Sequence, residues 1–335
     1  MKEPRRDSYM ELVCPAGNPA ALETAVLAGA DSVYCGLKGP TNARNYPGLN
    51  FDPDELKAGV AFAHAHGCKI FVAINTFPRA GDATPWRQAV DASAEAEVDA
   101  VILADVGLLA YATKTHPTLR RHLSVQAAAS NPLSIAFYRE QFDIKRLVLP
   151  RVLALDEIRA LVERIGVEVE TFVFGSLGTM VEGRCFLSSY ITGISPSSDG
   201  ACAPASHVAY REEGDKLRAC LGSTTLNIFD KNESAAYPTP CKGRFLVNGK
   251  PLYLFEEPVG LNLAQMLPDL KAAGVTALKI EGRQRSRAYV EQVVRAFRTV
   301  LDALARGEEP ALSPELRAIV EGGRETCGAF RKGWR

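Results

Sequence analysis

The feature that most constrains the fold is a repeated alternation of short, β-branched apolar runs with segments of helical period. Parallel strands that are buried on both faces need continuous apolar runs of this kind, and a helix is the usual connection between them. The runs that we predict as strands are residues 11–15, 32–35, 69–74, 100–103, 122–126, 146–149, 170–174 and 277–280.

The segments between these runs have the periodicity and the start signals of helices. Asn18, for example, precedes Pro19, a pair typical of a helix N-terminus. Eight strands with intervening helices is the count that closes a (β/α)₈ barrel, and an open doubly wound sheet holds the same units. We predict an α/β fold, a (β/α)₈ TIM-like barrel. The predicted helices are residues 18–27, 53–66, 84–96, 106–115, 131–142, 155–165, 261–273 and 287–305.

One long interval breaks the alternation. Residues 175–258 follow the seventh strand without a clear strand–helix unit, and Asn248-Gly249 between two apolar runs predicts a hairpin. An insertion after a barrel strand lies over the face where such barrels place their active sites. The predicted organisation is seven βα units over 10–174, the insertion over 175–258, a closing helix, eighth strand and last helix over 259–305, and a helical appendage over 306–335.

The composition excludes several classes of function. The 39 basic and 39 acidic side chains give zero net charge, so no overall field draws the protein to a polyanion. The charged N-terminus lacks the apolar run of a signal peptide, and the longest apolar stretch, 101–112, contains Asp105, which predicts a cytoplasmic protein without a transmembrane segment. The motifs of zinc proteases, serine hydrolases, P-loops and dinucleotide-binding folds are absent from the sequence.

The eight cysteines divide by position. Cytosolic thiols stay reduced, so we expect no disulfide framework. Cys14, Cys35 and Cys68 lie on or beside predicted strands and are expected in the core, whereas Cys327 is isolated in the tail. Thiolates on irregular loops suit an iron–sulfur cluster, although zinc and a purely structural role stay open. The cysteines in the insertion are Cys185, Cys202, Cys220 and Cys241.

Polar residues stand where the predicted strands end. On a closed barrel these ends meet at one mouth, although any single polar residue at a strand end is ordinary. Arginine binds carboxylates through two parallel hydrogen bonds and stays charged, so Arg44, Arg151 and Arg283 are candidates to anchor a dicarboxylate. The predicted substrate-binding residues are Asn42, Arg44, Asn75, Gln126, Arg151, Glu281 and Arg283.

Six segments, residues 11–17, 41–51, 149–151, 182–190, 241–244 and 279–283, together resemble the collagenase-like peptidase family and, within it, the UbiU group of ubiquinone-biosynthesis proteins. The resemblance extends over residues 10–305. It implies a 4Fe-4S subunit of an oxygen-independent hydroxylase that acts on the ubiquinone ring precursor, with prephenate as the oxygen donor. It also implies a heterodimer with a UbiV-like paralogue and a UbiT-like lipid-binding accessory protein.

The same resemblance implies four cluster ligands. Three of their positions fall on Cys185, Cys202 and Cys241, but the first falls on Gly178, which has no ligating side chain. Four alternatives are open: a three-cysteine 4Fe-4S cluster with one iron open to water or substrate, a 3Fe-4S cluster, a chain without a cluster, or a substitute ligand. The candidate substitutes are Cys220, His207 and Asp199.

Other functions compete with this interpretation. Related family members hydroxylate RNA bases, but the balanced charge favours a small-molecule substrate and argues against stable binding of nucleic acid. A peptidase role finds no nucleophile–base pair in the sequence. Gly178 keeps a cluster-less scaffold open.

Overall fold

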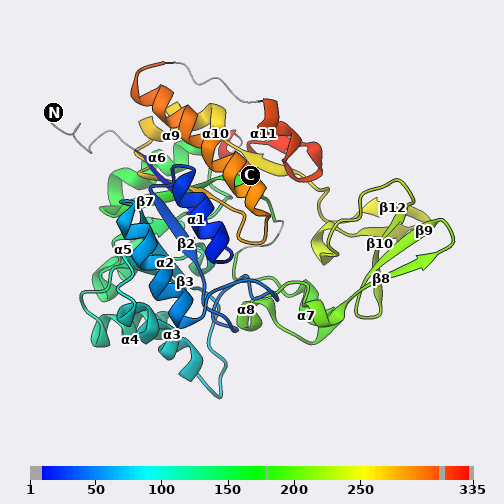
Figure 1. Ribbon diagram of the computed structural model, residues 1–335, viewed down its shortest axis with the longest axis horizontal. Coiled ribbons are helices and arrows are strands. Elements are labelled where there is room, and N and C mark those ends of the chain that lie inside the picture. The colour runs from blue at the N-terminus through cyan, green and yellow to red at the C-terminus, as the bar shows by residue number, and fades with distance from the viewer. Residues whose placement is uncertain (1–9, 179, 181, 309–313, 332–335) are drawn as a thin grey trace.

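A computed structural model describes residues 10–178, 180, 182–308 and 314–331 of the chain. Its centre is a barrel of eight parallel strands, closed because β14 pairs with both β1 and β7 (Figure 1). This closure confirms the predicted TIM-like barrel and excludes the open sheet. The barrel strands are β1 (Glu11–Pro15), β2 (Ser32–Cys35), β3 (Lys69–Ile74), β4 (Ala100–Leu103), β5 (Arg121–Leu123), β6 (Arg146–Val148), β7 (Glu168–Ser176) and β14 (Ala277–Ile280).

Helices surround the barrel, and several neighbouring pairs of helices pack side by side. Their ends follow local capping chemistry: in α2, for example, Asp52 and Glu55 form a reciprocal capping box. The seven main helices are α1 (Pro19–Leu27), α2 (Pro53–Ala65), α3 (Thr84–Glu95), α4 (Val106–Thr115), α5 (Pro132–Phe142), α6 (Leu155–Ile165) and α10 (Arg287–Ala305).

The predicted helix over 261–273 is wrong at its N-terminal end, and Ala264–Met266 form a short 3₁₀ helix before the α-helix begins. Residues Gly260–Asn262 form strand β13, which pairs antiparallel with the end of β7, and helix α9 covers only Leu267–Ala272. The cause is that β7 continues to Ser176 and offers an edge for pairing. Likewise, the described part of the tail holds helix α11 (Pro314–Ala318) and also strand β15 (Glu325–Thr326), which pairs with β13.

The insertion forms a lobe beside the barrel (Figure 1). The predicted hairpin at Asn248-Gly249 is confirmed, because both residues have positive φ, 52° and 76°, as a type I′ turn requires. The lobe contains helices α7 (Leu187–Thr192) and α8 (Pro196–Asp199), an antiparallel sheet of β8 (Val208–Glu213), β9 (Lys216–Leu221) and β10 (Thr224–Asp230), and the hairpin strands β11 (Arg244–Val247) and β12 (Lys250–Tyr253).

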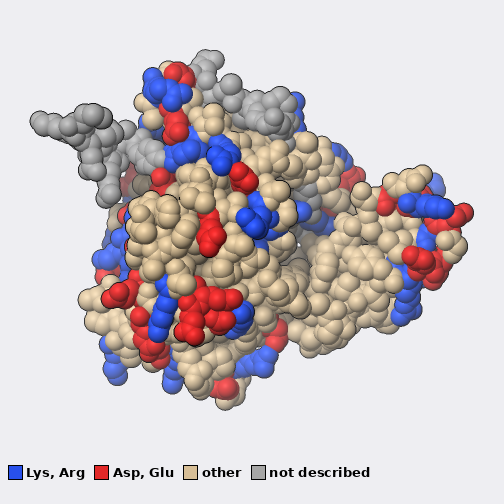
Figure 2. Space-filling view, viewed as in Figure 1, with Lys and Arg blue, Asp and Glu red and all other residues tan. Residues whose placement is uncertain are grey.

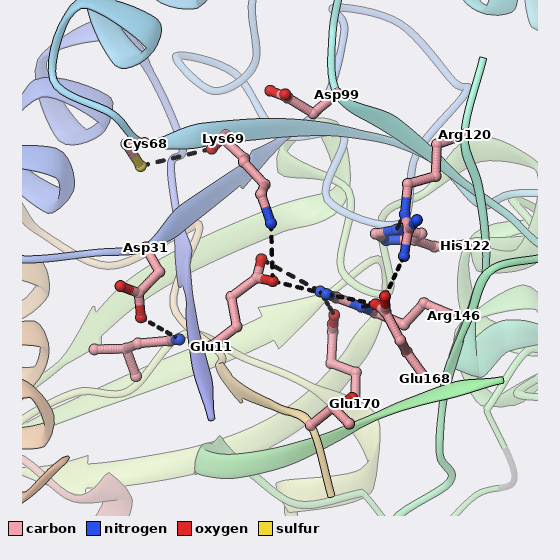
Figure 3. A network of polar contacts seen from close by, with 12 residues as sticks. Glu11, Asp31, Cys68, Lys69, Asp99, Arg120, His122, Arg146, Glu168 and Glu170 are labelled. Atoms are coloured by element: carbon pink, nitrogen blue, oxygen red, sulfur yellow. Dashed lines mark hydrogen bonds and ion pairs between the residues drawn. The ribbon is translucent and has the colours of Figure 1, made fainter. Parts of the chain in front are cut away.

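Paired charges occupy the interior at the N-terminal end of the barrel (Figure 3). Arg146 contacts Glu11 at 2.7 Å, Glu168 at 2.8 Å and Glu170 at 3.2 Å, and its side chain is almost fully buried. The other oxygen of Glu170 accepts a hydrogen bond from Lys279 Nζ at 2.6 Å. Buried ions are tolerated when paired in this way. The network therefore links the barrel floor to Lys279, which reaches the mouth.

The structure confirms the expectation for three of the cysteines. Cys14, Cys35 and Cys68 are buried in the barrel core, as their positions on apolar strands predicted. In the described parts of the chain, no helix combines the length and the apolar character needed to cross a membrane.

Candidate functional site

The carboxyl ends of the barrel strands surround a small pocket of about 70 Å³. Closure of the barrel brings together residues that are as far apart in the sequence as Arg44 and Arg283. Asn42 does not line the pocket: it is fully buried behind it, and its side chain accepts a hydrogen bond from Arg283. The predicted residues that line the pocket are Arg44, Asn75, Gln126, Arg151, Glu281 and Arg283.

Glu281 lies between two arginines. Its Oε2 contacts Arg151 at 2.8 Å, and its Oε1 forms a short ion pair with Arg44. Arg151 also contacts Glu182 at 3.1 Å, and its guanidinium stacks 3.6 Å from the centre of the Phe172 ring. Burial acts to raise the pKa of Glu281, but Arg151 and Arg44 outweigh it and lower the pKa, so this carboxylate stays ionised at neutral pH.

Arg283 differs from the other two arginines because it has no carboxylate partner within ion-pair distance among the described residues. It is only 5% exposed, donates a hydrogen bond to Asn42 Oδ1 at 3.1 Å, and lies 5.7 Å from the centre of the Tyr34 ring. Burial lowers the pKa of Arg283 to about 10, so it is still a cation at pH 7. A buried cation without a counter-ion is suited to bind an anionic ligand.

Among the pocket residues that sequence reasoning missed are one charged residue, Lys279, and two aromatic residues, Tyr34 and Phe172. The Lys279 ammonium lies 3.9 Å from the centre of the Tyr34 ring while it pairs with Glu170. A signal for Lys279 was present, because Lys279 is a charged residue within an apolar strand and precedes Glu281 by two positions. Side chains two apart on a strand share a face.

A charge count identifies what the pocket lacks. Four cations line it, and three of them pair with carboxylates, although Glu170 is shared between Lys279 and Arg146. Arg283 is the lining cation that has no carboxylate partner among the described residues. The carboxylates are Glu281, Glu182 and Glu170. The pocket therefore has the electrostatics of a site for one anionic group.

The three cysteines that the resemblance implies as cluster ligands come from separate segments of the insertion. The pKa of Cys241 is raised to about 11, mainly by burial and to a smaller extent by the nearby Cys202. Burial and Cys202 also raise the pKa of Cys185. Cys202 Sγ lies 3.2 Å from the Tyr46 hydroxyl. The three thiols are therefore close enough to interact electrostatically.

The described side chains fit a cluster in chemistry but do not form a finished metal site. No group of three or more His, Cys, Asp or Glu side chains in the described ranges is arranged to hold a metal ion. Cys220 is buried on β9, with Sγ 3.7 Å from Thr225 Oγ1. A Cβ atom at Gly178 would meet no atom within 4 Å, so this position has room for a larger side chain.

Comparison with known proteins identifies the family. The family model described as peptidase family U32 matches residues 17–333. The chain belongs to this family. An uncharacterized protease of Methanocaldococcus jannaschii is 32% identical over 303 residues, which cover 89% of this chain and 66% of the relative.

Two further relatives of the U32 chain are named for hydroxylation of RNA. A tRNA hydroxylation protein P of Haemophilus influenzae is 30% identical over 342 residues, with 93% of this chain and 72% of the relative covered. A 23S rRNA 5-hydroxycytidine C2501 synthase of Escherichia coli is 29% identical over 295 residues, with 88% and 40% covered. The chain thus spans about two thirds of the first and second relatives and two fifths of the third.

These relatives support the expected link to hydroxylation and the membership of the collagenase-like peptidase family. They do not support the expected exclusion of nucleic acid, because two of them are named for action on tRNA or rRNA.

Proposed function

We propose that this protein is a subunit of an oxygen-independent hydroxylation system and that its barrel mouth binds a carboxylate of the co-substrate that supplies the oxygen. The observation that carries the proposal is Arg283, a buried cation that lines the pocket without a carboxylate partner among the described residues. Hydroxylation as the reaction class is supported by the names of the relatives.

The co-substrate in this proposal is prephenate, a dicarboxylate. One carboxylate would pair with Arg283, and the second would compete with Glu281 for Arg44 and Arg151, which already face the pocket. Asn42 acts as a positioning residue, because its Oδ1 accepts hydrogen bonds from Arg283 Nη1 at 3.1 Å and from the Arg44 backbone N–H at 3.0 Å.

The acceptor in the leading proposal is the ring precursor of ubiquinone, with a UbiV-like paralogue and a UbiT-like accessory protein as partners. It is supported by the UbiU-like segments and by zero net charge. On the face shown in Figure 2, acidic and basic side chains are interspersed, without the single-sign stripe that tracks a nucleic-acid backbone. Hydroxylation of an RNA base is the second candidate, favoured by the relatives' names.

A 4Fe-4S cluster is part of the proposal, with Cys185, Cys202 and Cys241 as its ligands and Cys220 as a candidate substitute for the fourth. Such a cluster supplies one-electron transfer when it is bound. In the protein without a cluster, the raised pKa values of Cys185 and Cys241 keep these thiols protonated at neutral pH, so loading would release protons.

A peptidase role receives no support from the mouth pocket. Its serine, Ser124, receives hydrogen bonds from the Gln126 backbone N–H at 3.2 Å and from Asn75 Nδ2 at 3.4 Å. Both partners are donors, whereas an activated serine needs a base that accepts its proton.

The test is deletion of the gene in its host, followed by growth without oxygen and mass spectrometry of quinones and RNA nucleosides. We expect ubiquinone to disappear while hydroxylated nucleosides persist, and complementation by the wild-type gene but not by Arg283→Met. Loss of a hydroxylated nucleoside with normal ubiquinone would support the RNA candidate instead. If both products persist, the proposed function is wrong.

A further inference from the structure

Glu281 occupies the two arginines that an anionic ligand would also seek. It lines the mouth pocket, and its side chain is 14% exposed. Arg44 binds one of its oxygens and Arg151 the other, and both arginines line the same pocket. A ligand carboxylate that pairs with either arginine therefore comes next to the carboxylate of Glu281. When two carboxylates share a site, one of them is strongly favoured to take up a proton.

The backbone holds Glu281 in this place. Its N–H donates to the Phe174 carbonyl at 2.8 Å, and its carbonyl accepts a hydrogen bond from the Tyr289 hydroxyl at 3.3 Å. Strand β7 passes so closely that a Cβ atom at Gly175, where φ is 132°, would lie 2.5 Å from the Glu281 Cβ. Glu281 therefore cannot retreat from a ligand by a shift of its backbone, and added negative charge must be relieved at its carboxylate.

The arginines of the pocket accept one negative charge more than they already hold. Three arginines line it, and two carboxylates, Glu281 and Glu182, pair with two of them. Lys279 also lines the pocket, but it pairs with Glu170 of the floor network. A monocarboxylate at Arg283 balances the arginines, whereas a dicarboxylate adds one negative charge in excess.

The groups that face Glu281 differ in whether they can take up a proton. The arginines are already cations, and burial raises the pKa of Tyr34, so this phenol stays neutral. Burial lowers the pKa of Lys279, while Glu170 acts in the opposite direction, which makes Lys279 the competing proton acceptor. Lys242 does not line the pocket, and its Nζ donates to Ser176 Oγ at 3.1 Å. The charged or titratable side chains around Glu281 are Arg44, Arg151, Glu182, Lys242, Lys279, Arg283, Tyr34 and Tyr289.

We propose that Glu281 takes up one proton when a dicarboxylate binds to the mouth and then donates a hydrogen bond from its neutral carboxyl group to the ligand. The proton comes from the solvent: the O–H bond of Glu281 forms on binding and breaks when the ligand leaves, and no electron is transferred. Hydrogen bonds from a carboxyl group to a carboxylate are short and strong. The inference rests on the proposed function and adds to it the residue that allows the site to hold two negative charges.

The test is calorimetric titration of prephenate into the full chain, purified without oxygen, at about pH 6 in MES and in imidazole buffer, whose heats of ionisation differ. The dependence of the heat on the buffer gives the number of protons taken up per ligand. We expect close to one proton for prephenate and close to none for phenylpyruvate, a monocarboxylate with the same keto-acid chain. Equal uptake for the two ligands would overturn the proposal.

Glu281→Gln removes the proton acceptor but keeps its shape, because glutamine is neutral and donates a hydrogen bond as the protonated acid does. The wild-type affinity for prephenate should fall by up to about tenfold per pH unit between about pH 6 and 8, whereas that of Glu281→Gln should stay constant. Glu163→Gln is the matched control, because Glu163 is exposed on α6, and it should keep the wild-type proton uptake. Proton uptake that persists in Glu281→Gln would overturn the assignment and point to Lys279.

Infrared difference spectroscopy of the wild type covers the case in which Glu281→Gln does not fold. Prephenate should produce the C=O band of a protonated glutamic acid, identified by its shift in a chain with isotope-labelled glutamate, and phenylpyruvate should not. Absence of this band would overturn the proposal. Prephenate that binds without proton uptake removes only this inference, whereas a chain that binds neither ligand would contradict the carboxylate site of the proposed function as well.

Discussion

Replacement of Arg283 by methionine should stabilise the folded protein. Burial is the largest cause of the lowered pKa of this guanidinium, from 12.5 to about 10, and at about 1.4 kcal/mol per pKa unit this corresponds to ~3 kcal/mol. Arg283 is charged in both the folded and the unfolded chain below pH 10, so the full penalty is present at pH 7. Methionine is similar in length and has no charge to bury.

Loss of the hydrogen bond to Asn42 Oδ1 offsets about 1 kcal/mol of this gain. We therefore expect Arg283→Met to raise the free energy of unfolding by about 1–2 kcal/mol, or the melting temperature by roughly 1.5–3 °C for a chain of 335 residues. The assay is urea unfolding at pH 7 of the ligand-free chain. Arg285→Met is the control, because Arg285 is exposed on the same loop, and its change should stay within about 0.5 kcal/mol.

If Arg283→Met lowers the free energy of unfolding by more than about 1 kcal/mol, this reasoning is refuted, because Arg283 would then stabilise the folded protein even without a ligand. The same arginine is required for carboxylate binding in the proposed function. Opposite effects of one substitution on stability and on binding are the expected signature of a residue retained for a ligand.

Three further predictions follow from the barrel floor and the insertion. Arg146→Met should lower the free energy of unfolding, measured in urea, by about 3–5 kcal/mol, because it leaves Glu11 and Glu170 buried without this partner. Replacement of the exposed Arg159 by methionine should change the free energy of unfolding by less than about 0.5 kcal/mol. Equal effects of the two variants would contradict a stabilising role of the Arg146 network. Burial acts to raise the pKa of Glu11, but Arg146 and Lys69 outweigh it and lower the pKa to about 2. The ionised Glu11 should therefore contribute ~3 kcal/mol to the free energy of unfolding above pH 4.5, and this contribution should disappear as the pH falls towards 2. The same pH dependence of unfolding in a Glu11→Gln variant would contradict this. Gly178→Cys should fold normally, because a Cβ atom at this position meets no other atom. After anaerobic reconstitution it should bind more iron and sulfide per chain than the wild type and than the control Gly178→Ser. Equal iron contents of the three proteins would exclude position 178 from the cluster site.

The strands of the barrel could be predicted because each one is a short apolar run that can be recognised in the local sequence. The run Ala100–Leu103 is continuous and apolar, as a parallel strand buried on both faces requires, and strand and prediction coincide. Asp105 follows this strand, as the predicted mouth residues follow theirs, but its Oδ1 accepts a hydrogen bond from the Leu108 backbone N–H and caps α4. A residue that can cap a helix or line a pocket looks the same in the sequence.

The features that could not be predicted depend on contacts between residues that are far apart in the sequence. Leu261 and Asn262 were expected to be helical, but they pair with the end of β7 and form a strand instead. Glu281 pairs with Arg44 and Arg151, which lie more than 100 positions away in the sequence. Sequence spacing therefore could not show which arginines have a carboxylate partner and that Arg283 has none among the described residues. The contacts of Asn45 with Asp199 and Gly200, which fix the insertion to residues 41–51, likewise join distant parts of the chain.

The most direct test of the central claim is calorimetric titration of prephenate into the anaerobically purified chain, wild type and Arg283→Met. A charge-assisted pair with a carboxylate contributes about 1.5–3 kcal/mol, so the account predicts one site per chain with an affinity that falls about 10- to 150-fold in the variant. The Arg285→Met control should bind as wild type does. Equal affinities of wild type and Arg283→Met, or the absence of saturable binding in wild type, would contradict the assignment of the mouth as a carboxylate site.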